Sequence, residues 1–168
     1  MKVFGAQTDS WQDLLAHILK TQYGISPLPE LARTKEGKPY FPSLPALQFN
    51  ISHSKGHVLC AISRRPVGVD IEEIRPRRES LPRYALSPRE YADYEALGAD
   101  WPAFYTLWTR KEAWCKYTGQ GLAPLWGQTP PEDGLFSRSY QGDGWRAAVC
   151  GQEQPPETIC WLEKGDLP

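Results

Sequence analysis

The residues of this 168-residue chain that are best suited to chemistry are three acids and a lysine in two short motifs. The first motif, VGVDIE, places Asp70 and Glu72 two positions apart. The second motif, LWTRKEAWCK, places Glu112 four positions before Lys116. Carboxylate oxygens favour Mg²⁺ over zinc, and an ammonium group offsets the charge of a phosphate. The two motifs therefore predict a metal-dependent phosphate-transfer site.

A strand and a helix are expected to carry these residues. In the first motif, β-branched residues alternate with small or acidic ones, which predicts a strand. Asp70 and Glu72 then share one face, with their Cα atoms roughly 6.6 Å apart. Helical spacing places Glu112 and Lys116 on one face of the second motif. That helix has an apolar stripe at Phe104, Leu107, Trp108 and Cys115.

Each motif alone also has an ordinary structural interpretation. The two acids fit a solvated strand end, and a Glu–Lys pair at helical spacing is usually an exposed ion pair worth about 0.3–0.5 kcal/mol. A third motif, FNISHS, favours the chemical interpretation because it gathers Ser52, His53 and Ser54 at an expected strand-to-turn junction. Their side chains predict an anion pocket there.

Five blocks in order resemble the 4′-phosphopantetheinyl transferase superfamily, and most of all the type that activates surfactin synthetase. The blocks are GKP at 37–39, FNISHS at 49–54, GVDIE at 68–72, WTRKEAWCK at 108–116 and GQGL at 119–122. The resemblance implies an α+β fold with two pseudo-symmetric halves, each a helix plus an antiparallel sheet, and an active site in the cleft between them. We expect residues 1–74 and 75–168 to form these halves.

The resemblance also implies a reaction. The 4′-phosphopantetheine arm of coenzyme A would pass to a serine of an apo acyl or peptidyl carrier protein, with Mg²⁺, releasing adenosine 3′,5′-bisphosphate. Asp70, Glu72 and Glu112 would hold the metal, and Lys116 would steady the transferring phosphate. Glu112 would also take the serine proton, either directly or through a metal-bound water. Asp70, Glu112 and Lys116 are thus the expected catalytic residues.

Coenzyme binding is assigned by the same resemblance to a separate set of side chains. Lys38, Ser52 and His53 would hold the coenzyme, with the last two near its 3′-phosphate. Lys111 and Lys116 would add phosphate contacts. The chain departs from the family pattern at residues 5–17, which lack the Lys and Arg that relatives usually carry there.

Glu90 matches an acidic position of the family that has been considered for an accessory catalytic role. The local pattern gives it a structural role instead. In SPRE, Ser87 caps a helix, Pro88 takes its first position, and Glu90 completes a capping box. We therefore leave Glu90 out of the expected site.

Charge distribution indicates an acidic protein partner. The net charge is −1, yet residues 75–83 hold four arginines beside Leu81 and Tyr84. Nucleic-acid binding normally needs a broader basic surface, so we expect no nucleic-acid partner. Carrier proteins are commonly acidic helical bundles, so the resemblance implies that the 75–83 segment docks one. A solvated loop is the alternative interpretation.

Composition fits one compact enzyme unit. The chain is 40% hydrophobic and 23% charged, which is typical of a folded protein. Its cysteines and histidines form no zinc motif, and Cys60 and Cys115 lie in apolar contexts typical of a reducing compartment. With no signal peptide and no apolar run long enough for a membrane span, we expect a cytoplasmic monomer that contacts no membrane.

Local patterns also predict the elements outside the motifs. Residues 2–6 fit a strand, and Ser10 caps a helix over 10–22 that Gly24 ends. The strands at 58–62 and 67–72 flank a short link and are expected to form a hairpin. Three further strands are predicted at 136–140, 145–150 and 158–162.

Two other functions remain open from the sequence. The chain could bind a carrier or coenzyme A without catalysis, or it could be a Mg²⁺-dependent phosphoanhydride hydrolase using the same acids. The combination of acids and Lys116 disfavours the first, and the basic 75–83 segment disfavours the second.

Overall fold

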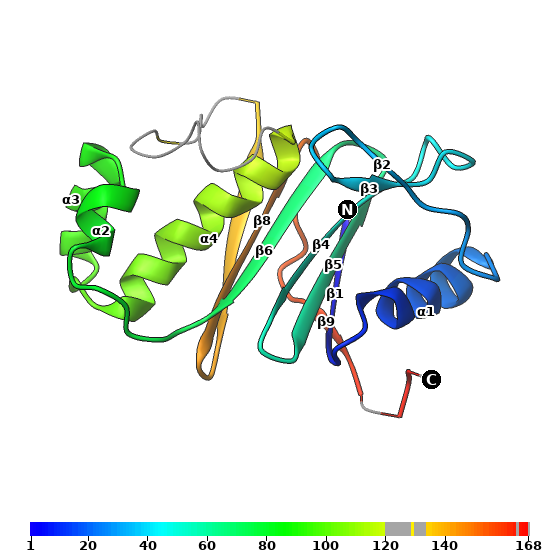
Figure 1. The fold of residues 1–168 in the computed structure, drawn as a ribbon, viewed down its shortest axis with the longest axis horizontal. Helices are drawn as coiled ribbons and strands as arrows, with labels where there is room; N and C mark the ends of the chain where they lie inside the picture. The colour runs from blue at the N-terminus through cyan, green and yellow to red at the C-terminus, as the bar shows by residue number, and fades with distance from the viewer. Residues whose placement is uncertain (120–128, 130–133, 164, 168) are drawn as a thin grey trace.

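The computed structural model describes residues 1–119, 129, 134–163 and 165–167 (Figure 1). It has an α+β fold, as expected, with helices packed on two sheets. Residues 120–122 of the GQGL block lie outside the described residues.

The first sheet has the strand order β4-β5-β1-β9. β5 pairs in antiparallel fashion with both β4 and β1, and β9 pairs with β1 in parallel. The bounds are β1 Lys2–Gln7, β4 Gln48–Ser54, β5 His57–Ser63 and β9 Cys160–Leu162. Helix α1, Trp11–Tyr23, packs its buried leucines and Ile18 on one face of this sheet. As predicted, Ser10 caps α1 and Gly24 ends it. Gly24 has the left-handed conformation, with φ 67°.

The second sheet has the strand order β6-β8-β7 and is antiparallel throughout. Its strands are β6 Val67–Glu73, β7 Phe136–Gly142 and β8 Trp145–Gly151. Helix α4, Trp101–Thr118, lies along this sheet (Figure 1). Two shorter helices pack near the N-terminal half of α4: α2, Leu81–Ala85, and α3, Pro88–Ala96. Between α1 and β4, strands β2, Ala32–Arg33, and β3, Pro39–Tyr40, form a small separate ladder.

The inner faces of the two sheets share a core. Val3, Leu59 and Ala61 of the first sheet are buried against Val69 and Val149 of the second. Alternate residues of β5, such as Cys60, face α1 instead. The first sheet is therefore covered on both faces, and α1 and α4 close the two outer sides of the molecule (Figure 1).

The expected hairpin between residues 58–62 and 67–72 is wrong. β5 and β6 belong to different sheets, and residues 64–66 carry the chain from one sheet to the other. The expected boundary at residue 74 also does not coincide with the division between sheets. β6 precedes that boundary but lies in the second sheet, whereas β9 follows it but lies in the first.

Within the described residues, no helix is both long and apolar enough to cross a membrane. All four cysteines are free, and Cys60 and Cys115 are buried as the sequence predicted.

Candidate metal centre and active site

Asp70, Glu72 and Glu112 come together in the structure. One carboxylate oxygen from each lies within 4.8 Å of the others. Asp70 and Glu72 reach this point because both side chains lie on one face of β6, and Glu112 comes from the face of α4 turned toward them. The three acids predicted from the sequence thus form one cluster at the place where β6 meets α4.

Gly68 explains how α4 comes so close to β6. A Cβ atom at this position would lie 1.9 Å from the Ala113 carbonyl oxygen and 2.4 Å from the Tyr117 backbone nitrogen. Those distances leave no space for any side chain, so only glycine allows the helix to cross the strand here. The contact lies next to Glu112 in the helix and two residues before Asp70 in the strand.

The cluster has the properties of a cation site. Lys116 Nζ donates to Asp70 Oδ1 at 2.7 Å, while Asp70 Oδ2 is buried with no hydrogen-bond partner. Burial, and then the Asp70 charge, raises the pKa of Glu112 to about 7. The same two causes raise the pKa of Glu72. Three repelling carboxylates with one unsatisfied oxygen suit a hard divalent cation such as Mg²⁺.

Trp108 supports the cluster in a way that the sequence motifs did not reveal. A hydrogen bond from its side chain lowers the pKa of Glu112 and so opposes the larger effects of burial and Asp70. The indole ring also stacks on Phe104 with a centroid distance of 5.8 Å. The sequence feature that indicates this contact is the spacing of four between Trp108 and Glu112, which places both side chains on one helix face.

Ser52 and His53 do not form the expected shared anion pocket. Both lie within strand β4 rather than in a turn, so their side chains point to opposite faces. Ser52 is buried and donates to Asp70 Oδ1 at 2.8 Å, whereas His53 is exposed. Ser52 therefore contacts the acidic cluster. Of these two residues, only His53 is exposed to a phosphate group that approaches from solvent.

Lys38 holds strand β6 and helix α4 together near the cluster. Its ammonium group donates to the Val67 carbonyl at 3.0 Å and to the Lys116 carbonyl at 2.9 Å. Burial lowers its pKa. The side chain lines a pocket beside Glu112, as a coenzyme contact requires, but its hydrogen bonds in this structure hold β6 and α4.

Lys111 does not face the cluster, which corrects its expected phosphate contact. Successive helix residues point about 100° apart, so Lys111 turns away from the side that presents Glu112. Its side chain is 1% exposed, and Nζ lies 2.6 Å from Glu90 Oε2 and donates to the Ala85 carbonyl. Lys111 therefore neutralises a buried acid between α3 and α4.

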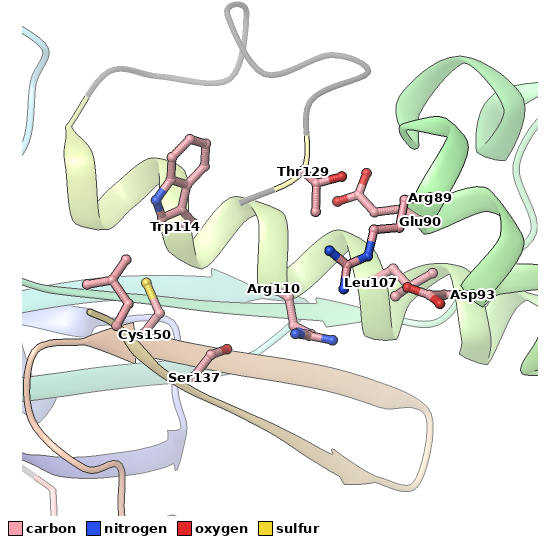
Figure 2. A pocket seen from close by; sticks show the side chains of 10 residues that line it. Arg89, Glu90, Asp93, Leu107, Arg110, Trp114, Thr129, Ser137 and Cys150 are labelled. Carbon is pink, nitrogen blue, oxygen red and sulfur yellow. The ribbon is translucent and has the colours of Figure 1, made fainter. Parts of the chain in front are cut away.

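Glu90 has the structural role that the sequence predicted. Its carboxylate accepts from the Ser87 backbone N–H at 2.7 Å, and Ser87 Oγ accepts from the Glu90 N–H, which completes the capping box. Glu90 lines a pocket of about 220 Å³. Leu107, Arg110 and Trp114 line the same pocket (Figure 2). These α4 residues lie on the side of the helix away from Glu112, so Glu90 is remote from the acidic cluster.

Two pockets flank the acidic cluster, and Glu112 lines both. One, of about 300 Å³, is bordered by Gly37, Lys38 and Lys116. The other, of about 620 Å³, is bordered by Glu72, Trp108 and the basic segment. The acids therefore stand between two spaces that can receive different molecules.

The basic segment forms one wall of the larger pocket. Arg77 and Arg78 are exposed there, and the Arg77 Nε donates to the Tyr105 hydroxyl at 3.3 Å. Tyr84 is 72% exposed, which is unusual for a large aromatic side chain. Arg83 instead lies over the Tyr91 ring, 4.9 Å from its centre. Positive charge and an aromatic surface thus adjoin the cluster on this side.

These features define an α+β protein whose acids and lysine meet where β6 passes α4, with a pocket on each side. A family model described as "4'-phosphopantetheinyl transferase superfamily" matches residues 66–157, more than half of the chain. The chain belongs to this superfamily. The matched range holds both acidic motifs and the whole second sheet.

Individual relatives agree with this assignment. A Bacillus subtilis 4'-phosphopantetheinyl transferase is 40% identical over 147 residues, covering 76% of this chain and 66% of the relative. The 4'-phosphopantetheinyl transferase Sfp of Bacillus subtilis (strain 168) is 33% identical over 92% of this chain and 78% of its own length. AcpT of Salmonella typhi, also a 4'-phosphopantetheinyl transferase, is 39% identical over 68% of this chain and 61% of its own.

Proposed function

We propose that this protein transfers the 4′-phosphopantetheine arm of coenzyme A to a serine of an apo carrier protein, in a Mg²⁺-dependent reaction. The observation that carries the proposal is the acidic cluster between two pockets, with Asp70 Oδ2 buried and unsatisfied. Asp70, Glu72 and Glu112 would hold Mg²⁺. When bound, the ion would neutralise the negative charge on the pyrophosphate oxygens.

The chain's own residues then have distinct roles. Lys116 already lies at the cluster and would contact the transferring phosphate once coenzyme A is present. Glu112 lines both pockets and would accept the proton of the serine hydroxyl. The serine oxygen would bond to phosphorus as the bond to the bridging oxygen breaks, and adenosine 3′,5′-bisphosphate would leave with that oxygen.

The two pockets suggest where the two substrates bind. The pocket with Lys38, Gly37 and Lys116 suits the anionic coenzyme. The pocket with Arg77, Arg78 and the nearby Tyr84 suits an acidic carrier protein with some apolar surface. His53, exposed on the other face of β4, would be a contact for the 3′-phosphate. A monomeric state and a cytoplasmic location stay predictions.

Mass spectrometry of apo carrier proteins tests the proposal. Each carrier of a panel, drawn from fatty-acid, polyketide and peptide synthesis, is incubated with the protein, coenzyme A and Mg²⁺. We expect at least one carrier to gain the mass of one phosphopantetheine arm, and chelation of Mg²⁺ to abolish the gain. Asp70→Asn and Glu112→Gln should each lower the rate at least a hundredfold, because each removes a metal-binding oxygen.

Two controls separate the proposal from the other candidate functions. Cooperative thermal unfolding of Asp70→Asn and Glu112→Gln would show that the variants remain folded. Full turnover by both variants would contradict the assigned site. Tight binding of several carriers without modification would favour a non-catalytic binding role, and release of phosphopantetheine in the absence of any carrier would favour a hydrolase.

A further inference from the structure

Strands β4 and β6 lie side by side at the junction of the two sheets, but no backbone ladder joins them. Instead, alternate side chains of β4 accept hydrogen bonds from the backbone of β6. The backbone N–H groups of Val69, Ile71 and Glu73 donate to Asn50, Ser52 and Ser54, at 2.9, 3.2 and 3.1 Å. The pairs keep a constant offset of 19 residues, so the two strands run in the same direction.

Two of these three side chains also contact a cluster acid. Ser52 Oγ donates to Asp70 Oδ1 at 2.8 Å, and Ser54 Oγ donates to Glu72 Oε2 at 3.1 Å. Each serine thus accepts from the N–H that follows an acid and donates to the carboxylate of that acid. This pair of hydrogen bonds occurs twice, once at Ser52 and once at Ser54. The two occurrences are two residues apart on each strand, which is the side-chain period of a strand.

The hydrogen-bonding capacity of Ser52 fixes the direction of its proton. A hydroxyl group has one donor and two acceptor sites. Both acceptor sites are used, by the Ile71 N–H at 3.2 Å and by Lys116 Nζ at 2.8 Å. The single proton must therefore go to Asp70 Oδ1. Lys116 donates to that same oxygen, so both partners hold Oδ1, and the buried Oδ2 keeps its capacity to bind a cation.

We propose that Ser52 and Ser54 are positioning residues that orient Asp70 and Glu72 for a divalent cation. This inference rests on the metal site of the proposed function and adds residues from β4 to it. Hydrogen bonds that fix the orientation of metal-binding carboxylates typically change metal affinity 10–100-fold when removed. The first sheet therefore contributes to an ion site whose three acids all come from β6 and α4.

Binding of Mn²⁺ to the full chain, without coenzyme or carrier, tests the inference. Electron paramagnetic resonance of free Mn²⁺ gives the dissociation constant, and thermal unfolding gives the stability. We expect Ser52→Ala and Ser54→Ala each to weaken Mn²⁺ binding about tenfold. Ser54→Thr keeps the hydroxyl in a half-buried position, so its affinity should stay within about threefold of the wild type.

Asn50→Ala is the matched control. It removes the same kind of bond to β6 but breaks no bond to a carboxylate, so we expect a lower unfolding temperature with Mn²⁺ affinity within about twofold of the wild type. The inference is overturned if both serine variants keep wild-type affinity, or if Asn50→Ala weakens binding as much as they do. Absence of Mn²⁺ binding by the wild type would overturn the metal site itself, a distinct result.

Discussion

Glu112 combines burial with charge repulsion, and this makes the stability of the metal-free protein depend on pH. Its pKa is raised from the ordinary value of 4.5 to about 7. Between these values the folded state binds more protons than the unfolded state, so the free energy of unfolding falls as the pH rises. Glu72, whose pKa is also raised, acts in the same direction.

We expect this cluster to lower the stability of the metal-free protein by about 1–3 kcal/mol between pH 4.5 and 7. Mg²⁺ at the proposed site would replace the proton, so its stabilising effect should be larger at pH 7.5 than at pH 5.5. Urea unfolding at both pH values, with Mg²⁺ or a chelator, measures this difference. Glu112→Gln should remove most of the pH effect. An equal Mg²⁺ effect at both pH values would contradict the assignment.

Single residues also show where sequence interpretation succeeded and where it failed. Period two in β6 correctly placed Asp70 and Glu72 on one face, because that rule needs only the local backbone. The same rule, applied to β4, separates Ser52 from His53, because the strand continues to Ser54 where the sequence predicts a strand-to-turn junction. Lys111 adjoins Glu112 in sequence and yet pairs with Glu90, because neighbouring helix positions face different surroundings.

Helix α4 and strand β6 depend on one glycine for their close contact. In Gly68→Ala the added Cβ would meet backbone atoms of α4, which cannot rotate away as a side chain does. We expect the helix to shift, at a cost of about 3 kcal/mol in stability. The shift would also move Glu112 away from Asp70, so turnover should fall at least tenfold. Chemical denaturation and the carrier-modification assay measure the two effects.

Gly165→Ala is the control for this substitution, because among the described residues no atom beyond its chain neighbours lies within 4 Å of a Cβ built there. It should change stability by less than about 0.5 kcal/mol. Wild-type turnover and stability in Gly68→Ala would show that α4 has room to adjust, and that the crossing of helix and strand does not require a glycine.

Elements were easier to predict than their partners. The caps at Ser10 and Ser87 and the end at Gly24 depend on a few adjacent residues, and all appear in the structure. The β5–β6 hairpin was inferred from a short link, but a short link can also carry the chain between two sheets. Strand pairing depends on which faces must be buried, and both strands have apolar residues for the shared core.

At the scale of the whole molecule, positive charge is concentrated beside one pocket of a protein with a net charge of −1. An acidic carrier would be steered to this side by long-range attraction. Arg78→Glu should therefore lower kcat/KM for the carrier about tenfold at low salt, with an unchanged KM for coenzyme A. The effect should shrink at high salt, because screening shortens the reach of the charges.

Arg65→Glu makes the same charge change at an exposed position near the other end of β6. It should leave kcat/KM for the carrier within about twofold of the wild type. An equal loss in both variants would mean that net charge, and not the segment at residues 75–83, governs the encounter. Steady-state kinetics at two salt concentrations distinguish these results.

The exchange of strands between the sheets has a consequence for how the protein reaches its native state. The first sheet needs β9, near the end of the described chain, and the second needs β6 together with strands β7 and β8. Neither sheet is complete until distant parts of the polypeptide have come together, so the chain is expected to fold as one cooperative unit. Asp70 and Glu112 meet only at that stage, and capture of a divalent ion would report that assembly is complete.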